Sequence, residues 1–152
     1  ELGLDNHMAN RAAEADKPTS GLETADQQIE FFTSMSEQEQ VQFLQSALKA
    51  TGEEGRLEIA RLHDAWRSGD DRVIWEEMAV EMREEFPAVY QRINVDRNDA
   101  WVPQLEAMLG PDGTGNTLVV VGALHLVGED GVVEKLQAKG YEVERICSAC
   151  AD

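Results

Sequence analysis

Apolar residues that recur three and four positions apart predict amphipathic helices in the first half of the chain. One stripe comprises Val41, Leu44 and Leu48, and a second comprises Ile59, Leu62 and Trp66. Helix starts are expected where Ser or Thr precedes Glu or Gln by three residues, the spacing of a capping box. Such pairs are Thr24 with Gln27, Ser36 with Glu39, and Thr51 with Glu54.

A helical hairpin is predicted around Gly69. Asp70 can cap a further helix, with Ile74, Met78 and Met82 on its buried face, that ends before Pro87. A separate helix with an apolar face formed by Trp101, Leu105 and Met108 follows. Because Pro103 is tolerated only in a first helical turn, this helix is predicted to begin near Ala100, with Asn98 or Asp99 as its cap.

Three segments have the pattern of β-strands. Residues 17–23 enter through Pro18, residues 117–121 form a continuous β-branched run typical of a buried strand, and residues 141–146 alternate. A helix over 129–139 separates the last two strands, which predicts a right-handed βαβ unit. The sequence therefore predicts one helix-rich α/β domain over 1–152. Its small, mainly parallel sheet would carry a large helical insertion between the first and second strands.

The charge of the chain excludes some partners. Thirty acidic residues against thirteen basic ones give a net charge of −17. This charge repels nucleic acid and anionic lipid. No apolar run is long enough to span a membrane. Cys147 and Cys150 have no helix left to open, so a local disulfide, free thiols or an intermolecular link is expected, and not redox catalysis.

Two predicted strand ends carry groups that could do chemistry. Glu23 closes the first strand, and Gly122 to His125 follows the second. Ligands of open α/β sheets bind beyond the carboxyl ends of strands, so a carboxylate and an imidazole could converge there. Gly122 would permit a sharp turn through a positive φ angle, which aims His125 into the crevice. Structural roles for both residues stay open, because a lone His or Glu often only packs or caps.

Several motifs in order resemble the TraB/GumN family, which is similar to the Tiki metalloproteases and is related to erythromycin-esterase-like and ChaN-like folds. The C-terminal motif spans 119–131 and contains Gly122-Ala123-Leu124-His125. Before it come Gly21-Leu22-Glu23-Thr24, then 66–70, then Arg97-Asn98 with Trp101. The resemblance covers almost the whole chain.

The resemblance implies a metal-dependent hydrolase, with a peptide or protein as its substrate. The family site uses two Gly-x-x-His motifs and a glutamate, which would make His125 a ligand of Mn, Co or Zn and Glu23 a ligand or general base. Arg97 and Asn98 would accompany them. The first Gly-x-x-His is absent, since Gly3 and His7 stand one residue too far apart. The chain is thus expected to be the C-terminal part of a longer, exported, periplasmic or membrane-associated protein.

Two alternatives to an enzyme remain open from the sequence. The helices could form a non-catalytic module that binds peptide or protein. Alternatively, the chain could fold as an inactive truncated domain that forms homo-oligomers to cover its apolar surface.

Overall fold

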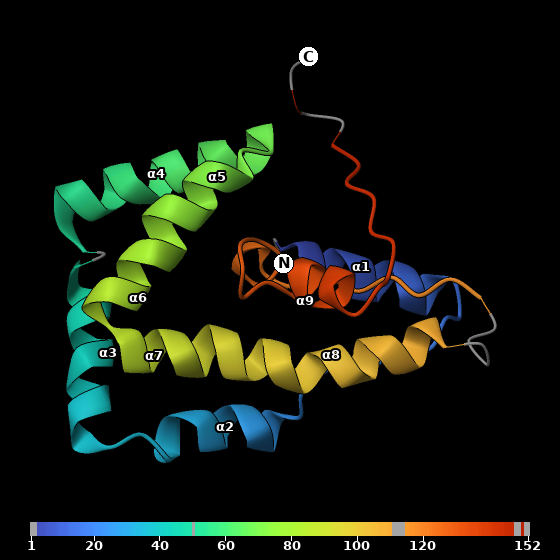
Figure 1. The fold of residues 1–152 in the computed structure, drawn as a ribbon, viewed down its shortest axis with the longest axis horizontal. Helices are drawn as coiled ribbons and strands as arrows, with labels where there is room; N and C mark the ends of the chain where they lie inside the picture. Colours follow the sequence, from blue (N-terminus) through green and yellow to red (C-terminus); the bar gives the residue numbers. More distant parts are fainter. Residues whose placement is uncertain (1–2, 50, 111–114, 148–149, 151–152) are drawn as a thin grey trace.

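The computed structural model describes residues 3–49, 51–110, 115–147 and 150. Their helices follow one another along most of the chain (Figure 1). The α-helices are α1 (Leu4–Glu14), α2 (Ala25–Thr33), α3 (Glu37–Lys49), α4 (Gly52–Ser68), α5 (Asp71–Ile74), α6 (Glu81–Glu85), α7 (Pro87–Tyr90), α8 (Asp96–Leu109) and α9 (Val132–Ala138). Two π-helical segments, η1 (Trp75–Val80) and η2 (Gln91–Val95), and one 3₁₀ turn, η3 (Ala123–His125), lie between them.

The predicted α/β fold is wrong, because no strand or sheet forms in the described ranges, which are all-α. Residues 117–121 and 141–146 are extended but have no ladder partner among these residues, and a strand exists only through such pairing. Residues 17–23 are also irregular. There the carbonyl of Leu22 accepts a hydrogen bond from Gln104 Nε2 at 3.0 Å, so a side chain of α8 holds this segment in place of a neighbouring strand.

Several predicted helix starts are confirmed by their hydrogen bonds. The Thr24 amide donates to Gln27 Oε1 at 2.8 Å, and the Gln27 amide donates to Thr24 Oγ1 at 3.2 Å. Ser36 and Glu39 form the same reciprocal pair. Thr51 directly precedes α4 but makes no such bond with its side chain. A capping box depends only on residues three positions apart, so these helix starts can be predicted from the sequence.

The hairpin around Gly69 also forms, and Ile74 is buried as predicted, but Met78, which was predicted on the buried face, is exposed. Gly69 ends α4 with φ at 74°, and Asp70 accepts the Val73 amide at 3.1 Å to start α5. α5, η1 and α6 then run as one helical stretch toward Pro87, which occupies the first turn of α7. The apolar stripes of α3 and α4 stay largely exposed in this chain, Val41, Leu44, Leu48, Ile59 and Trp66 among them.

The predicted break before Ala100 is wrong. Helical structure continues from Pro87 to Leu109, so Arg97 and Asn98 both lie within it, and Pro103 sits inside α8. Asn98 does not cap a helix because its side chain is used in tertiary hydrogen bonds. Pro103 cannot donate the amide that a helix would direct to the carbonyl four residues earlier, so the helix tolerates one missing hydrogen bond there.

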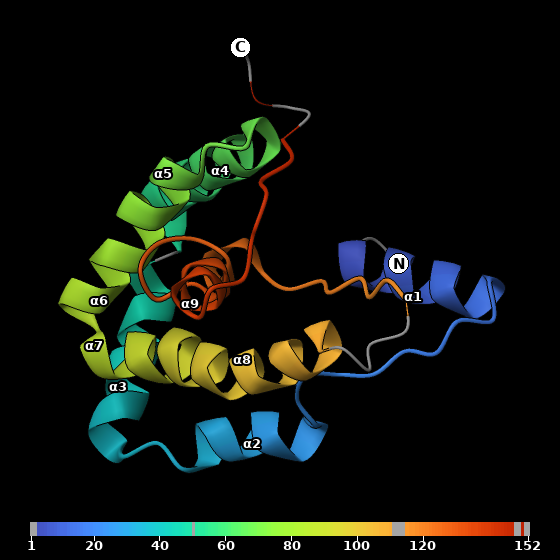
Figure 2. The ribbon, with the colours of Figure 1, turned by 45° about the vertical axis from the view of Figure 1, so that its right-hand side comes forward.

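The core lies where α9 packs on α8. Its buried members are Trp101, Val102, Leu105 and Val132, with Leu22, Met108, Val121 and Leu136 packed around them. Figures 1 and 2 both show α8 running between α2 on one side and α9 on the other. Figure 2 shows α1 standing apart from this group, in keeping with its lack of buried residues. The core therefore centres on the face of α8 that neighbours Arg97 and Asn98.

Candidate functional site

Three segments far apart in the sequence meet at the first half of α8. Glu23 comes from the turn before α2, Arg97, Asn98 and Trp101 come from α8, and His125 ends η3. We call these five residues the polar cluster. The structure thus brings together the Glu, Arg, Asn and His that the sequence singled out. It does so on the side of a helix and not at the edge of a sheet.

Glu23 and Arg97 form a two-pronged ion pair. Arg97 Nε donates to Oε1 at 2.8 Å, and Arg97 Nη2 donates to Oε2 at 3.0 Å. The indole Nε1 of Trp101 donates to Oε1 at 3.0 Å, and Gln28 adds a weaker bond at 3.4 Å. Burial raises the pKa of Glu23, but the hydrogen bonds and charge of Arg97 outweigh this, and the pKa of Glu23 is lowered. Glu23 is therefore an ionised carboxylate with both oxygens engaged.

The hydrogen bonds of Asn98 decide which nitrogen of His125 carries the proton. Asn98 is fully buried, and its Nδ2 donates to the backbone carbonyl of Asp130 at 2.7 Å. Its Oδ1 therefore faces His125 Nδ1, 2.7 Å away, and can only accept. Nδ1 must be the protonated nitrogen, so Nε2 is unprotonated and can only accept a hydrogen bond.

The free nitrogen of His125 faces a cation. Arg97 Nη1 donates to Nε2 at 3.4 Å and to the Ile93 carbonyl at 3.4 Å. The imidazole packs against the Trp101 ring with 4.5 Å between centroids, and the guanidinium of Arg97 lies 4.8 Å from the centre of the same ring. Burial first and the charge of Arg97 second lower the pKa of His125 to about 4, against a smaller opposing effect of Glu23. The ring is neutral near pH 7.

Gly122 does not have the conformation predicted for it. Its φ is −60°, which any residue adopts, and an added Cβ would lie 3.7 Å from the His125 ring, an ordinary contact. The short turn η3 aims His125 instead, with the His125 amide donating to the Gly122 carbonyl at 3.0 Å. The left-handed glycine of this loop is Gly128, with φ at 71°, where an added Cβ would overlap the Trp75 ring.

A second layer of polar residues behind the cluster was missed from the sequence. Asn94 is fully buried and donates to the Tyr90 hydroxyl at 3.2 Å, and that hydroxyl donates to Asp130 Oδ2 at 2.9 Å. Burial, followed by the hydrogen bond to Asp130, raises the pKa of Tyr90 to about 12. The spacing of Tyr90, Asn94 and Asn98, four residues apart, puts them on one helix face and could have revealed this layer.

The donors of the polar cluster do not complete a site for a divalent metal. The described residues hold no group of three or more His, Cys, Asp and Glu side chains suited to a metal. His125 Nε2 and Glu23 offer a suitable nitrogen and carboxylate, but Arg97 is bonded to Glu23 and adjoins Nε2. Catalytic metal sites use about three protein ligands. Binding of Mn, Co or Zn at this place would therefore require Arg97 to move away and a third ligand to be supplied.

The residues that meet in the polar cluster all lie in a part of the chain that a family model matches. The model of the TraB/PrgY/gumN family matches residues 1–145. The chain belongs to the TraB/PrgY/gumN family. Comparison with curated proteins and with solved structures finds no match. The polar cluster falls within the stretch that carries the family match, and no helix in the described ranges is long and apolar enough to cross a bilayer.

Proposed function

We propose that the polar cluster is one part of a hydrolase site in this TraB/PrgY/gumN family member, with a peptide as the candidate substrate. The observation that carries the proposal is the Asn98 to His125 hydrogen bond of 2.7 Å. A histidine that acts as a ligand or base commonly donates its other ring nitrogen to a fixed acceptor, which sets its tautomer. Asn98 holds His125 in that state, with the ring neutral and Nε2 unprotonated.

Each residue has a role that its contacts support. His125 offers the nitrogen lone pair, Asn98 positions it, and Arg97 lies against it. Glu23 holds Arg97 through two hydrogen bonds, and the same carboxylate could accept a proton or contact a ligand after that pair opens. Membership of the family supports these assignments. A divalent metal could bind here only if a third ligand joined His125 and Glu23.

The first test is calorimetric titration of the chain with Mn²⁺, Co²⁺ and Zn²⁺. The intact chain should bind weakly, since two donors and an adjacent cation disfavour a metal. Arg97→Ala removes the cation and should bind at least about tenfold more tightly. Adding His125→Ala to Arg97→Ala should abolish that gain. His63→Ala is the matched control, because the exposed His63 lies outside the cluster. Equal binding with and without His125 would refute a metal role for it.

The second test uses a longer family member that contains this chain. His125→Ala there should abolish metal-stimulated peptide cleavage while leaving the helical circular dichroism unchanged. Cleavage that persists would overturn the hydrolase proposal. Peptide binding that survives both chelation and loss of His125 would instead favour a non-catalytic binding module.

Location is a further part of the proposal. We propose an exported or membrane-associated parent protein, as the family resemblance implies. Cys147 and Cys150 support this, because they form a disulfide in the structure and disulfides persist in oxidising compartments. Reaction of the native chain with a thiol reagent, before and after reduction, measures whether the bond exists in the purified protein.

A further inference from the structure

The backbone carbonyl of Asp130 fixes the orientation of the Asn98 side-chain amide. A carbonyl can only accept a hydrogen bond, so the Asn98 atom that lies 2.7 Å from it must be Nδ2. The other end of the amide, Oδ1, then faces His125 Nδ1 at 2.7 Å. Whatever holds Asp130 in place therefore also holds the tautomer of His125.

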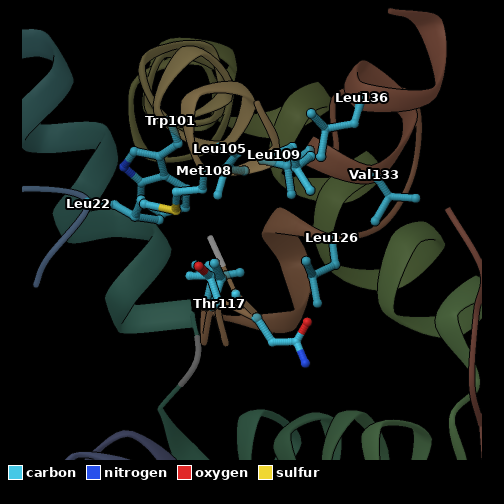
Figure 3. A pocket seen from close by; sticks show the side chains of 14 residues that line it. Leu22, Trp101, Leu105, Met108, Leu109, Thr117, Leu126, Val133 and Leu136 are labelled. Atoms are coloured by element: carbon cyan, nitrogen blue, oxygen red, sulfur yellow. The ribbon is translucent and has the colours of Figure 1, made fainter. Parts of the chain in front are cut away.

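Packing of the His125 ring against Trp101 does not select a tautomer. The two ring centroids lie 4.5 Å apart, and Trp101 also lines an apolar groove together with Met108 (Figure 3). Such apolar contact is much the same whichever ring nitrogen carries the proton. Arg97 Nη1 donates to Nε2 over 3.4 Å, which is long for a hydrogen bond. The bond of 2.7 Å from Nδ1 to Asn98 is the stronger determinant of the tautomer.

The side chain of Asp130 is bound by the Tyr90 hydroxyl in a directed chain of hydrogen bonds. The hydroxyl lies 2.9 Å from Asp130 Oδ2. A carboxylate only accepts, so the hydroxyl must donate its single proton to Asp130. It then accepts from the fully buried Asn94, whose Nδ2 lies 3.2 Å away. Burial, followed by the hydrogen bond to Asp130, raises the pKa of Tyr90 to about 12, so the hydroxyl stays a donor at neutral pH.

The loop that carries Asp130 is also held by η1 and α6. Trp75 lies so close to Gly128 that an added Cβ there would overlap its ring. Arg83 packs over the same ring at 5.5 Å from the centroid and lies 3.8 Å from Asp130 Oδ2. The Arg83 side chain is 40% exposed, and ion pairs of exposed side chains contribute little in water. Tyr90 is only 2% exposed, so water competes least with its bond to Asp130.

We propose that Tyr90 is a positioning residue of the candidate site, which acts through Asp130 and Asn98 to keep His125 protonated at Nδ1. The Tyr90 hydroxyl anchors the Asp130 side chain, the carbonyl of Asp130 orients the Asn98 amide, and this amide selects the tautomer. The consequence for catalysis rests on the proposed function of His125. The effect on the tautomer can be measured without any activity.

The test reads the tautomer of His125 from the ¹⁵N shifts of its two ring nitrogens at neutral pH. Tyr90→Phe removes only the hydroxyl. It should raise the ratio of rings protonated at Nε2 to rings protonated at Nδ1 at least about threefold, because a typical hydrogen bond is worth more than this ratio. Tyr141→Phe, the matched control at the other tyrosine of the chain, should leave the ratio unchanged. An unchanged ratio in Tyr90→Phe would overturn the positioning role.

Variants of Asp130 separate the hydrogen bond from a general effect on folding. Asp130→Ala removes the acceptor and should shift the ratio as Tyr90→Phe does. Asp130→Asn keeps an oxygen for the hydroxyl and should retain the original ratio. Ile74→Val removes one buried methyl group in α5 and should lower stability without shifting the ratio. Circular dichroism verifies that each variant folds. A shift in Asp130→Asn or Ile74→Val as large as in Tyr90→Phe would contradict the chain of hydrogen bonds.

Activity of a longer family member that contains this chain distinguishes the positioning role from the proposed function. Tyr90→Phe there should lower kcat at least about threefold with little change in KM, since it alters His125 and removes no contact of the substrate. If Tyr90→Phe shifts the tautomer but cleavage does not depend on His125, the positioning role is supported and the hydrolase proposal is refuted. If cleavage depends on His125 but the tautomer does not depend on Tyr90, the positioning role alone is refuted.

Discussion

Two regions around Trp101 differ in how far the chain completes them. In one, the indole Nε1, the Glu23 carboxylate and the Asn98 amide all have partners within the described residues. Elsewhere, the ring lines an apolar groove of about 540 Å³ between α8 and α9, beside residues 117–121, whose backbone has no hydrogen-bond partner among the described residues. Polar side chains find partners over one or two contacts, but a strand needs a whole neighbouring segment. The comparison shows that the polar cluster can assemble although the predicted sheet does not form among the described residues.

The largest effect is expected from removing the Asn98 side chain, because it makes two buried hydrogen bonds of the polar cluster. Asn98→Ala leaves His125 Nδ1 and the Asp130 carbonyl without partners in a buried environment. At about 1–3 kcal/mol for each unsatisfied group, the loss should be on the order of 3 kcal/mol of unfolding free energy. Urea unfolding measures it. Gln104→Ala, which removes an exposed bond to Leu22, should cost less than about 1 kcal/mol. Equal losses would mean that Asn98 is not an anchor of the site.

Gly128→Ala should have the next largest effect, by disturbing the loop that follows His125. The backbone at Gly128 has φ at 71°, and an added Cβ would overlap the Trp75 ring. Strain and overpacking together should cost about 2–3 kcal/mol. Thermal unfolding measures the loss. Gly122→Ala is the matched control, since its φ of −60° and its open surroundings accept a methyl group. Comparable losses at the two glycines would contradict the loop geometry.

Glu23→Gln should be milder, at about 1–2 kcal/mol, because the pair is only partly buried. It should also lower the pKa of His125 further, since the Glu23 carboxylate opposes the shift that Arg97 causes. Histidine titration by NMR measures this second effect. Glu76→Gln, in an exposed pair with Arg72, should change stability by less than about 0.5 kcal/mol. A raised His125 pKa in Glu23→Gln would contradict the electrostatics of the cluster.

The stability of the chain should also depend on mild acid. Folding lowers the pKa of His125 from 6.5 to about 4, so the folded state binds this proton less readily than the unfolded chain. The contribution of neutral His125 to the free energy of unfolding is fully present above pH 6.5 and is lost as the pH falls toward 4. His125→Gln should flatten that decline between pH 6.5 and 5, a range above the Glu23 titration. Unfolding measured at both pH values checks this, and an unchanged slope would contradict a neutral buried ring.

The sequence predicted local features and the meeting of distant residues better than the architecture. Thr24, Ser36 and Asp70 act through residues three positions away, so their capping pattern is readable. The convergence of Glu23 and His125 was predicted from the ends of two parallel strands, and the two side chains do meet at Arg97, although the described residues form no sheet. The β-branched pattern of 117–121 reports strand propensity, and no pattern within one segment can report whether a partner strand is present.

Other misses have equally physical causes. Pro103 and the polar pair Asn98 and Asp99 favour a helix start, but tertiary hydrogen bonds to His125 and Asp130 use the Asn98 side chain inside a continuous helix. The positive φ expected at Gly122 belongs instead to Gly128. In the first case a residue type suited to a local role serves long-range contacts, and only the folded arrangement distinguishes the two roles.

The most direct test of the site is the tautomer of His125, read from the ¹⁵N shifts of its two ring nitrogens by NMR at neutral pH. The arrangement around Asn98 predicts a neutral ring protonated at Nδ1, with Nε2 unprotonated, and loss of this fixed state in Asn98→Ala. A ring protonated at Nε2, or at both nitrogens, would contradict the hydrogen bond on which the proposed function depends.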